Sequence, residues 1–440
     1  MSAAVAPAGT AVRSAKRAQP EGSAIRHFLR SGVTYWGAML AVGACNLGFS
    51  LIAARRLGPS AYGALAAIVA LVNVFLIAAS AITRTVTVVV ATADDRATGA
   101  SIFRRGTVAA AGAGVVAMFL VGLAAAPVAH ALHMQDPVWI WIAAASLVPA
   151  FAGAVTTGIL QGLRLFRASG GVNLTAAVLK LITLLLLLDA GLGVAGAGMA
   201  TLAEVTLIWL VAIPLLHRMF RGVRETPARA GAARHGSLAL PAALTVARLV
   251  FFNLDILVAR HYLGPEDAGL FAALAVTGRI IAYGTGALPP VVYPYLVRHR
   301  GDAGLMTRYL ALCLAATAVA GGGAIAVLGL APVSVVRVLF DSAFSGIAPY
   351  VAWYGLAFLL YSLSYVLLHY LLAVENWWVW VYAVGGGLAE VGALAVFHGG
   401  IGRLTAVETV FFGILFILTS AQTAVGLRRQ RRAAAASTAA

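Results

Sequence analysis

Charged residues are scarce in this sequence. Asp, Glu, Lys and Arg make up 10% of its 440 residues, whereas 61% are hydrophobic and the mean hydropathy is +0.93. An average soluble domain has roughly 25% charged residues. Because no water-soluble fold hides so much apolar surface, the composition excludes a soluble enzyme and predicts a membrane protein.

Cysteine is also scarce. Cys45 and Cys313 lie far apart, each inside an apolar stretch. They support neither a disulfide framework nor a metal site, and we interpret both as buried spectator thiols. His130, His133 and Asp136 share one predicted loop, but three such residues make no convincing metal or catalytic set. We therefore predict no metal, no cofactor and no enzymatic activity.

The apolar residues form long stretches. A membrane-spanning helix needs about 20 mostly apolar residues, and twelve such stretches begin near residues 34, 63, 106, 138, 171, 194, 238, 268, 306, 348, 376 and 404. The first, Thr34 to Ala54, holds 21 residues without a charge. No cleavage site with a short apolar core precedes it, so we interpret it as a retained span. The sequence predicts an all-α polytopic membrane protein of about 12 transmembrane helices.

The net charge of +16 is unevenly distributed along the chain. If the N-terminus is cytoplasmic, the inside segments hold 22 of the 31 Lys and Arg residues, the outside segments hold five, and four lie within spans. The positive-inside rule explains this distribution, so nucleic acid is not needed as a partner. We predict that both termini are cytoplasmic.

One motif occurs twice. Leu57-Gly58-Pro59-Ser60-Ala61-Tyr62-Gly63 matches Leu263-Gly264-Pro265-Glu266-Asp267-Ala268-Gly269 at an offset of 206 residues, and each copy follows a span that ends in Ala-Arg. Gly-Pro favours a tight turn between two spans. Because six spans separate the copies, we predict two halves related by a pseudo-twofold axis along the membrane normal, with a binding site between them.

This repeat defines the predicted organisation. Two pseudo-symmetric six-helix bundles cover residues 31–216 and 237–427, and a basic cytoplasmic linker, residues 217–236, joins them. The basic tails, residues 1–30 and 428–440, are rich in Ala and Arg. We predict that both tails are disordered and cytoplasmic.

Several motifs point to a known family. The segment Ala54 to Pro59 with Tyr62-Gly63 resembles the first loop of bacterial polysaccharide-export flippases, which belong to the multidrug, oligosaccharidyl-lipid and polysaccharide exporter superfamily. The resemblance covers most of residues 34–300, and beyond that it is one of hydropathy. It continues at Leu160 to Phe166, at Asp255 with Leu263-Gly264-Pro265 and Gly269, and at Leu288-Pro289 through Tyr293-Pro294.

The resemblance implies a transporter in the bacterial inner (plasma) membrane. Such a protein moves a polyprenyl-diphosphate-linked oligosaccharide from the inner to the outer leaflet by alternating access, for polysaccharides such as O-antigen or capsule. Its implied partners are this substrate, membrane lipids, and the glycosyltransferases and polymerase of the same pathway.

Other functions are compatible with the hydropathy. A multidrug or organic-cation antiporter of the same superfamily would normally carry acidic residues in its cavity, and a peptidoglycan lipid-precursor flippase shares the diphosphate chemistry. A membrane polysaccharide polymerase or ligase would be expected to carry a large outer loop with catalytic groups. A facilitator-type transporter would carry Gly-x-x-x-Asp-Arg in its second loop, where Asp94-Asp95-Arg96 is only a superficial match.

Charges inside spans are the candidate functional residues, since each costs about 2.5 to 3.5 kcal/mol near the bilayer centre. Guanidinium groups bind phosphate oxygens bidentately, and an ammonium acts as a point charge. The candidates for binding the substrate diphosphate are Arg248, Arg279, Arg84 and Lys180. Mutual neutralisation is the alternative, with Lys180 pairing with Glu204 and Arg279 with Asp255.

Two further groups of residues have candidate roles. Arg55, Arg56 and Arg260 lie at the predicted outer mouth, where they either contact the anionic head group or meet lipid phosphates. An ion-coupled cycle needs a carboxylate whose charge changes with conformation. The candidate coupling carboxylates are Asp255, Glu204 and Glu390.

Overall fold

The computed structural model describes residues 21–93, 96–134, 136–223, 235–286, 288–300 and 302–439, and these form helices and short connections without a strand. The first part of the chain folds into α1 (Glu21–Ala93), α2 (Arg96–Ser101), η1 (Ile102–Gly106), α3 (Thr107–Leu123), α4 (Ala125–Ala131), α5 (Val138–Ala145), α6 (Leu147–Gly162), α7 (Phe166–Asp189) and α8 (Gly193–Phe220). We call α1 to α8 the N-terminal half.

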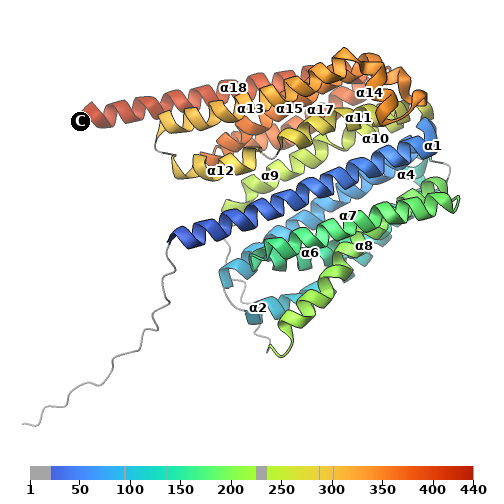
Figure 1. Ribbon diagram of the computed structural model, residues 1–440, viewed down its shortest axis with the longest axis horizontal. Helices are drawn as coiled ribbons and strands as arrows, with labels where there is room; N and C mark the ends of the chain where they lie inside the picture. The colour runs from blue at the N-terminus through green and yellow to red at the C-terminus, as the bar shows by residue number, and fades with distance from the viewer. Residues whose placement is uncertain are drawn as a thin grey trace, which may run out of the picture.

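The C-terminal half is everything from α9 onward. Its helices are α9 (His235–Phe251), α10 (Leu254–Tyr262), α11 (Pro265–Thr285), α12 (Leu288–Arg298), α13 (Ala303–Leu330), α14 (Pro332–Leu339), η2 (Ser342–Tyr350), α15 (Val351–Ala373), α16 (Trp378–Trp380), η3 (Val381–Gly385), α17 (Gly386–Val396) and α18 (Ile401–Ala439). Figure 1 shows that the long helices of both halves run roughly parallel to the longest axis of the molecule.

Ten helices in the described part of the chain are long and apolar enough to cross a membrane. The longest, Gly37–Ala93, contains two crossings, because Gly58 has φ 74° and ψ 170° and interrupts the helix at the first Leu-Gly-Pro turn. One more crossing consists of α9 and α10, which a break at Phe252 and Asn253 separates. With these two additions, the ten apolar helices account for twelve membrane crossings. The predicted fold class, an all-α polytopic membrane protein, is confirmed.

The helices of each half pack mainly on one another. In the N-terminal half α1 packs on α6 and α7, in the C-terminal half α15 packs on α18, α13 and α11, and the halves meet where α1 contacts α11. Small residues permit close approach of membrane helices. A Cβ atom on Gly158 or Gly162 of α6 would lie 2.8 or 2.7 Å from the Cβ of Val86 or Val90 of α1.

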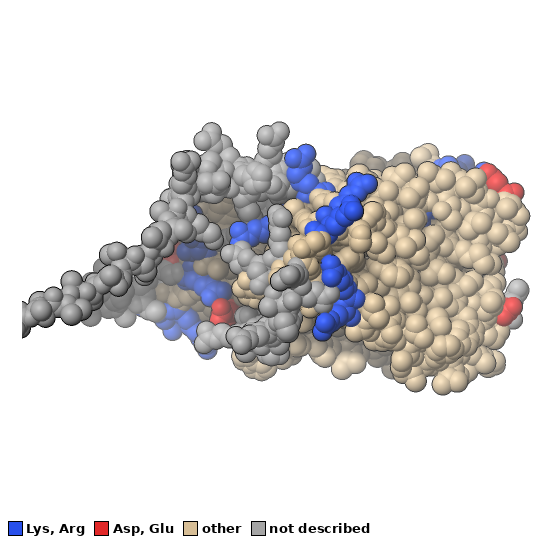
Figure 2. Space-filling view, turned by 90° about the horizontal axis from the view of Figure 1, so that it is seen from below, with Lys and Arg blue, Asp and Glu red and all other residues tan. Residues whose placement is uncertain are grey.

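The molecule has two ends that differ in structure and charge. At the terminal end lie the start of α1, the end of α18, α2 and α12, and at the opposite end, the turn end, lie α4, α10 and α14 (Figure 1). Figure 2 shows Lys and Arg side chains gathered toward the terminal end, next to a broad surface that carries no charge. This distribution is what the positive-inside rule requires if the terminal end is cytoplasmic.

The predicted tails and linker lie partly outside the described residues. In the described part of the tails, α1 begins at Glu21 and α18 continues to Ala439. Both tails, which we predicted to be disordered, therefore contain helix. The extension of α18 follows from composition, because Ala and Arg are among the best helix formers. Residues 224–234 of the predicted linker are not described, and α8 extends to Phe220.

Candidate functional site

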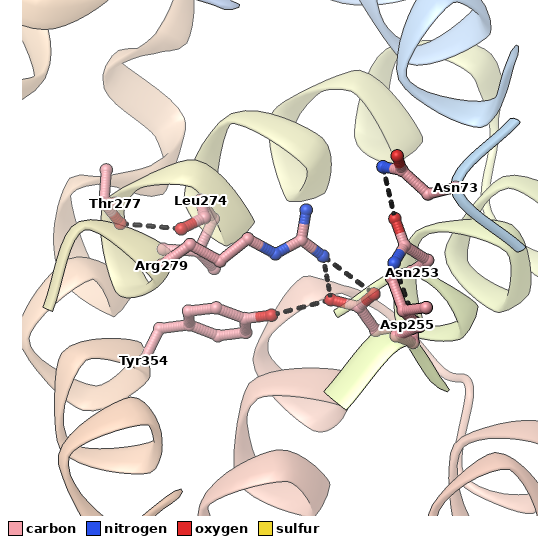
Figure 3. Close-up of polar contacts among 8 residues, drawn as sticks. Asn73, Asn253, Asp255, Leu274, Thr277, Arg279 and Tyr354 are labelled. Carbon is pink, nitrogen blue, oxygen red and sulfur yellow. Dashed lines mark hydrogen bonds and ion pairs between the residues drawn. The ribbon is translucent and has the colours of Figure 1, made fainter. Parts of the chain in front are cut away.

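A buried ion pair lies behind the break in the seventh crossing. The Nη2 atom of Arg279 on α11 is 2.9 Å from both carboxylate oxygens of Asp255 on α10, and the Tyr354 hydroxyl on α15 donates to the same carboxylate at 3.0 Å (Figure 3). The Asp255 side chain is 0% exposed and that of Arg279 is 11% exposed. The two charges neutralise one another, as a low-dielectric interior requires, and the buried Nε atom of Arg279 has no hydrogen-bond partner among the described residues.

Polar groups also link the two halves near this ion pair. Asn253, at the break, accepts a hydrogen bond of 2.9 Å from the Asn73 side chain of α1 and donates to the Leu249 carbonyl at 2.6 Å (Figure 3). A cavity of about 60 Å³ lies between the halves here, and its lining includes both asparagines, Arg279 and Tyr62. The break in the helix therefore supplies polar groups to the interface between the halves.

The N-terminal half has its own buried ion pair. The Lys180 ammonium on α7 is 2.7 Å from the Glu204 carboxylate on α8 and 3.0 Å from the Asn46 side-chain oxygen on α1. It also lies 4.2 Å from the centroid of the Phe49 ring, a cation–π contact. Lys180 and Arg279, two of the four predicted diphosphate ligands, are thus already paired with a carboxylate.

The other two predicted diphosphate ligands have no such partner. Within the described part of the chain, neither Arg84 nor Arg248 forms an ion pair. Arg84 of α1 donates to the Thr245 hydroxyl of α9. Because Thr245 precedes Arg248 by three residues, Arg84 reaches the face of α9 that also carries Arg248, where the halves meet.

Arg248 is open to solvent although protein surrounds it. Its side chain is exposed, and its guanidinium carbon is 5.7 Å from the ring centroids of both Phe252 and Tyr283. Arg248 and Phe252 line a small pocket together with Tyr361 and Tyr365. Aromatic rings, hydroxyl groups and an accessible guanidinium together form a surface suited to an anionic group attached to apolar or sugar moieties.

Two carboxylates are buried without a donor. Glu390 of α17 and Glu408 of α18 are 1% and 0% exposed, and no described residue donates a hydrogen bond to either. They interact electrostatically with each other and with Asp255 and Arg279. Both groups are acceptors when ionised, so a contact between them is favourable only with a shared proton or a cation.

Glu408 is a residue that our sequence reasoning missed. It lies in the last predicted span, so the rule that singled out Glu390, a charge inside an apolar stretch, applies to it equally. Glu204, by contrast, lies in the N-terminal half beside Lys180, apart from the other predicted coupling carboxylates. The structure thus brings Asp255, Glu390 and Glu408 together in the C-terminal half.

The three arginines of the predicted outer mouth lie at the turn end, and each has a protein partner. Arg56 pairs with Asp189 at 3.1 Å, and both side chains are more than half exposed. Arg55 donates to the Leu339 carbonyl at 3.0 Å, and Arg260 donates to the Leu132 carbonyl at 2.9 Å. Arg55 and Arg260 therefore contact backbone of the opposite half.

Comparison with known proteins places the fold. No protein-family model and no curated protein matches the sequence. Among solved structures, an inward-facing multidrug resistance MATE family transporter of the MOP superfamily has a TM-score of 0.69 at 14% identity, covering 88% of this chain and 95% of its own. An outward-facing multidrug resistance MATE family transporter of the MOP superfamily has a TM-score of 0.61 at 14% identity, covering 91% of this chain and 96% of its own.

A lipid transporter has a similar structure. The lipid II flippase MurJ in an inward closed conformation has a TM-score of 0.67 at 14% identity, covering 90% of each chain. The chain therefore has the fold shared by membrane transporters of the MOP superfamily. This fold, with ten long apolar helices in the described residues, is that of a multi-pass membrane protein.

Proposed function

We propose that this protein flips a polyprenyl-diphosphate-linked oligosaccharide from the inner to the outer leaflet of a bacterial inner membrane by alternating access. The observation that carries the proposal is the pair Arg84 and Arg248. One arginine comes from each half, Arg84 donates to Thr245 on the helix face that carries Arg248, and neither arginine has a carboxylate partner among the described residues. Two unneutralised guanidinium groups at the interface of the halves favour an anionic substrate over an organic cation.

The same chemistry supports one second candidate. A peptidoglycan lipid precursor also carries a polyprenyl diphosphate, and the solved lipid II flippase shares the fold. The tyrosines around Arg248 favour contact with sugar rings in either case, because a tyrosine presents an apolar face and a hydroxyl group. The proposed head-group site is therefore the same for both substrates.

We further propose that coupling resides in the C-terminal half. Asp255, Glu390 and Glu408 interact electrostatically there, and two of the three lack a donor within the described residues. Taking up a proton or a cation would relieve their mutual repulsion. Glu204 is less suited to this task, because the ammonium of Lys180 already neutralises it.

The test is flipping of a fluorescent polyprenyl-diphosphate oligosaccharide by the full chain in proteoliposomes. Arg84→Gln and Arg248→Gln each remove charge-assisted hydrogen bonds worth roughly 1.5 to 3 kcal/mol, so we expect each to lower lipid affinity about 10- to 140-fold. Arg308→Gln, an exposed arginine of α13, is the matched control and should flip like the wild type. A wild type that moves no lipid but exchanges organic cations for protons would make the proposal wrong.

A further inference from the structure

Arg55 joins the two halves at the turn end. It follows the first crossing on α1, and its guanidinium donates to the carbonyls of Val338 and Leu339, the last two residues of α14. α1 belongs to the N-terminal half and α14 to the C-terminal half, so this contact crosses the interface.

Arg260 makes the reciprocal contact. It lies near the end of α10 in the C-terminal half, and its Nε and Nη2 atoms donate to the carbonyls of Leu132 and His133 at 2.9 and 3.0 Å. These two residues directly follow α4 in the N-terminal half. The neighbouring His261 adds a 2.6 Å contact between its Nδ1 atom and the Ala131 carbonyl.

The two contacts are equivalent under the internal repeat. Arg55 and Arg260 are 205 residues apart, and their acceptors Leu132 and Leu339 are 207 apart. Both offsets are within one residue of the 206 residues between the Leu-Gly-Pro copies. Each half therefore contributes one arginine and one helix end to the other half, in the manner of a twofold-symmetric interface.

The chemistry of each contact is strong and specific. The last carbonyls of a helix have no partner within the helix and carry a partial negative charge. A guanidinium group presents several donors in a fixed plane, so it can satisfy two adjacent carbonyls at once. We call the contacts of Arg55 with α14 and of Arg260 with α4 the two arginine clasps.

The two Leu-Gly-Pro turns also contact each other across the halves. A Cβ atom added to Gly63 would lie 2.8 Å from the backbone nitrogen of Gly269, and one added to Gly269 would overlap the Pro59 carbonyl oxygen. The two Leu-Gly-Pro turns therefore touch backbone to backbone, because glycine at these positions leaves no side chain in between. At this end the halves are closed against each other.

We propose that the two arginine clasps and the Gly63–Gly269 contact form the gate at the turn end, and that substrate leaves there only when both clasps release. This inference rests on the proposed alternating access. Closure uses helix-end carbonyls, so opening exposes them to water, which replaces the lost hydrogen bonds. Loss of either arginine weakens the closed state specifically and shifts the population toward opening at the turn end.

The experiment measures distances between spin labels on the full chain, with Cys45 and Cys313 replaced by alanine. One pair of labels, at Ser60 and Glu266, flanks the gate on exposed positions of opposite halves, and a second pair, at Thr92 and Arg298, reports on the terminal end. Pulsed electron–electron double resonance in nanodiscs then gives the distances between the labels, and from them the populations of open and closed states without any substrate.

We expect Arg55→Gln and Arg260→Gln each to raise the ratio of open to closed turn end at least tenfold, because each loses two charge-assisted hydrogen bonds and a single one accounts for about tenfold. Arg56→Gln is the matched control, because its exposed ion pair with Asp189 stays within the N-terminal half. Arg55 is exposed, so Arg55→Gln carries the test even where the buried Arg260 variant fails to fold.

Unchanged distances in Arg55→Gln would overturn the gate, and so would an equal shift in Arg56→Gln, which would indicate a general charge effect. The measurement is independent of the substrate. If the turn end opens as expected in Arg55→Gln but the wild type flips no lipid, only the proposed function is refuted. A chain that flips lipid while Arg55→Gln leaves the distances unchanged refutes only the gate.

Discussion

Replacing Arg279 by methionine would test whether this arginine is a structural partner or a substrate ligand. Asp255 is fully buried and Arg279 nearly so, and removing one member of such a pair costs about 3 to 5 kcal/mol because the other charge stays buried. Among the described residues, the Tyr354 hydroxyl would remain as the one side-chain donor to Asp255, at 3.0 Å. We expect Arg279→Met to lower the free energy of unfolding by about 3 to 5 kcal/mol.

The double variant Asp255→Asn, Arg279→Met completes a mutant cycle. It removes both charges of the pair, and Tyr354 can still donate to the asparagine oxygen, so neither member of the pair is left as a lone buried charge. A coupling energy of up to about 3 kcal/mol between directly contacting residues is expected. The assay is unfolding by SDS in mixed micelles, followed by the fluorescence of the eight tryptophans, together with lipid flipping for all four proteins.

The outcomes separate the two roles of Arg279. If Arg279 is structural, the double variant regains both stability and flipping. If Arg279 also binds the diphosphate, the double variant regains stability but not flipping. A loss below about 1 kcal/mol in Arg279→Met, the size measured for exposed pairs, would refute the reasoning, because it would mean that the pair is solvated.

Three further outcomes are expected. Lys180→Met should destabilise the chain by about 3 to 5 kcal/mol, and adding Glu204→Gln should restore most of that loss in the same SDS titration. Gly269→Ala should raise the open fraction of the turn end in the spin-label measurement, because the added methyl group overlaps Pro59 only in the closed state. Arg56→Gln should change the free energy of unfolding by less than about 1 kcal/mol, since both members of its pair with Asp189 are exposed; a larger loss would contradict its assignment as a surface pair.

The architecture was largely predictable from the sequence. Hydropathy places each crossing because a spanning helix must be about 20 residues long, and the Leu-Gly-Pro repeat places the first turn of each half. Hydropathy predicts the two crossings within α1, which the non-helical backbone at Gly58 separates, and the seventh crossing. It does not predict the break at Asn253 that divides this crossing into α9 and α10.

The site was less predictable, for physical reasons. A charge inside a span signals importance, but its partner depends on helix rotation and depth, which sequence does not specify. Lys180 with Glu204 and Asp255 with Arg279 were the alternative to ligand binding, and the structure shows both pairs. That Arg55 and Arg260 bind backbone carbonyls had no sequence signal, because a carbonyl acceptor is present at every residue.

The unequal ion pairing of the halves has a consequence for energetics. The buried pair of the N-terminal half is neutral, whereas the C-terminal half sets one guanidinium, Arg279, against three carboxylates, Asp255, Glu390 and Glu408. Any charge that this cluster takes up on one side of the membrane and releases on the other moves through the membrane potential. Moving one elementary charge across changes the free energy by about 2.3 kcal/mol per 100 mV. We therefore expect the turnover rate to follow an imposed potassium diffusion potential, and the charge-neutral variant Glu390→Gln, Glu408→Gln to lose that voltage dependence.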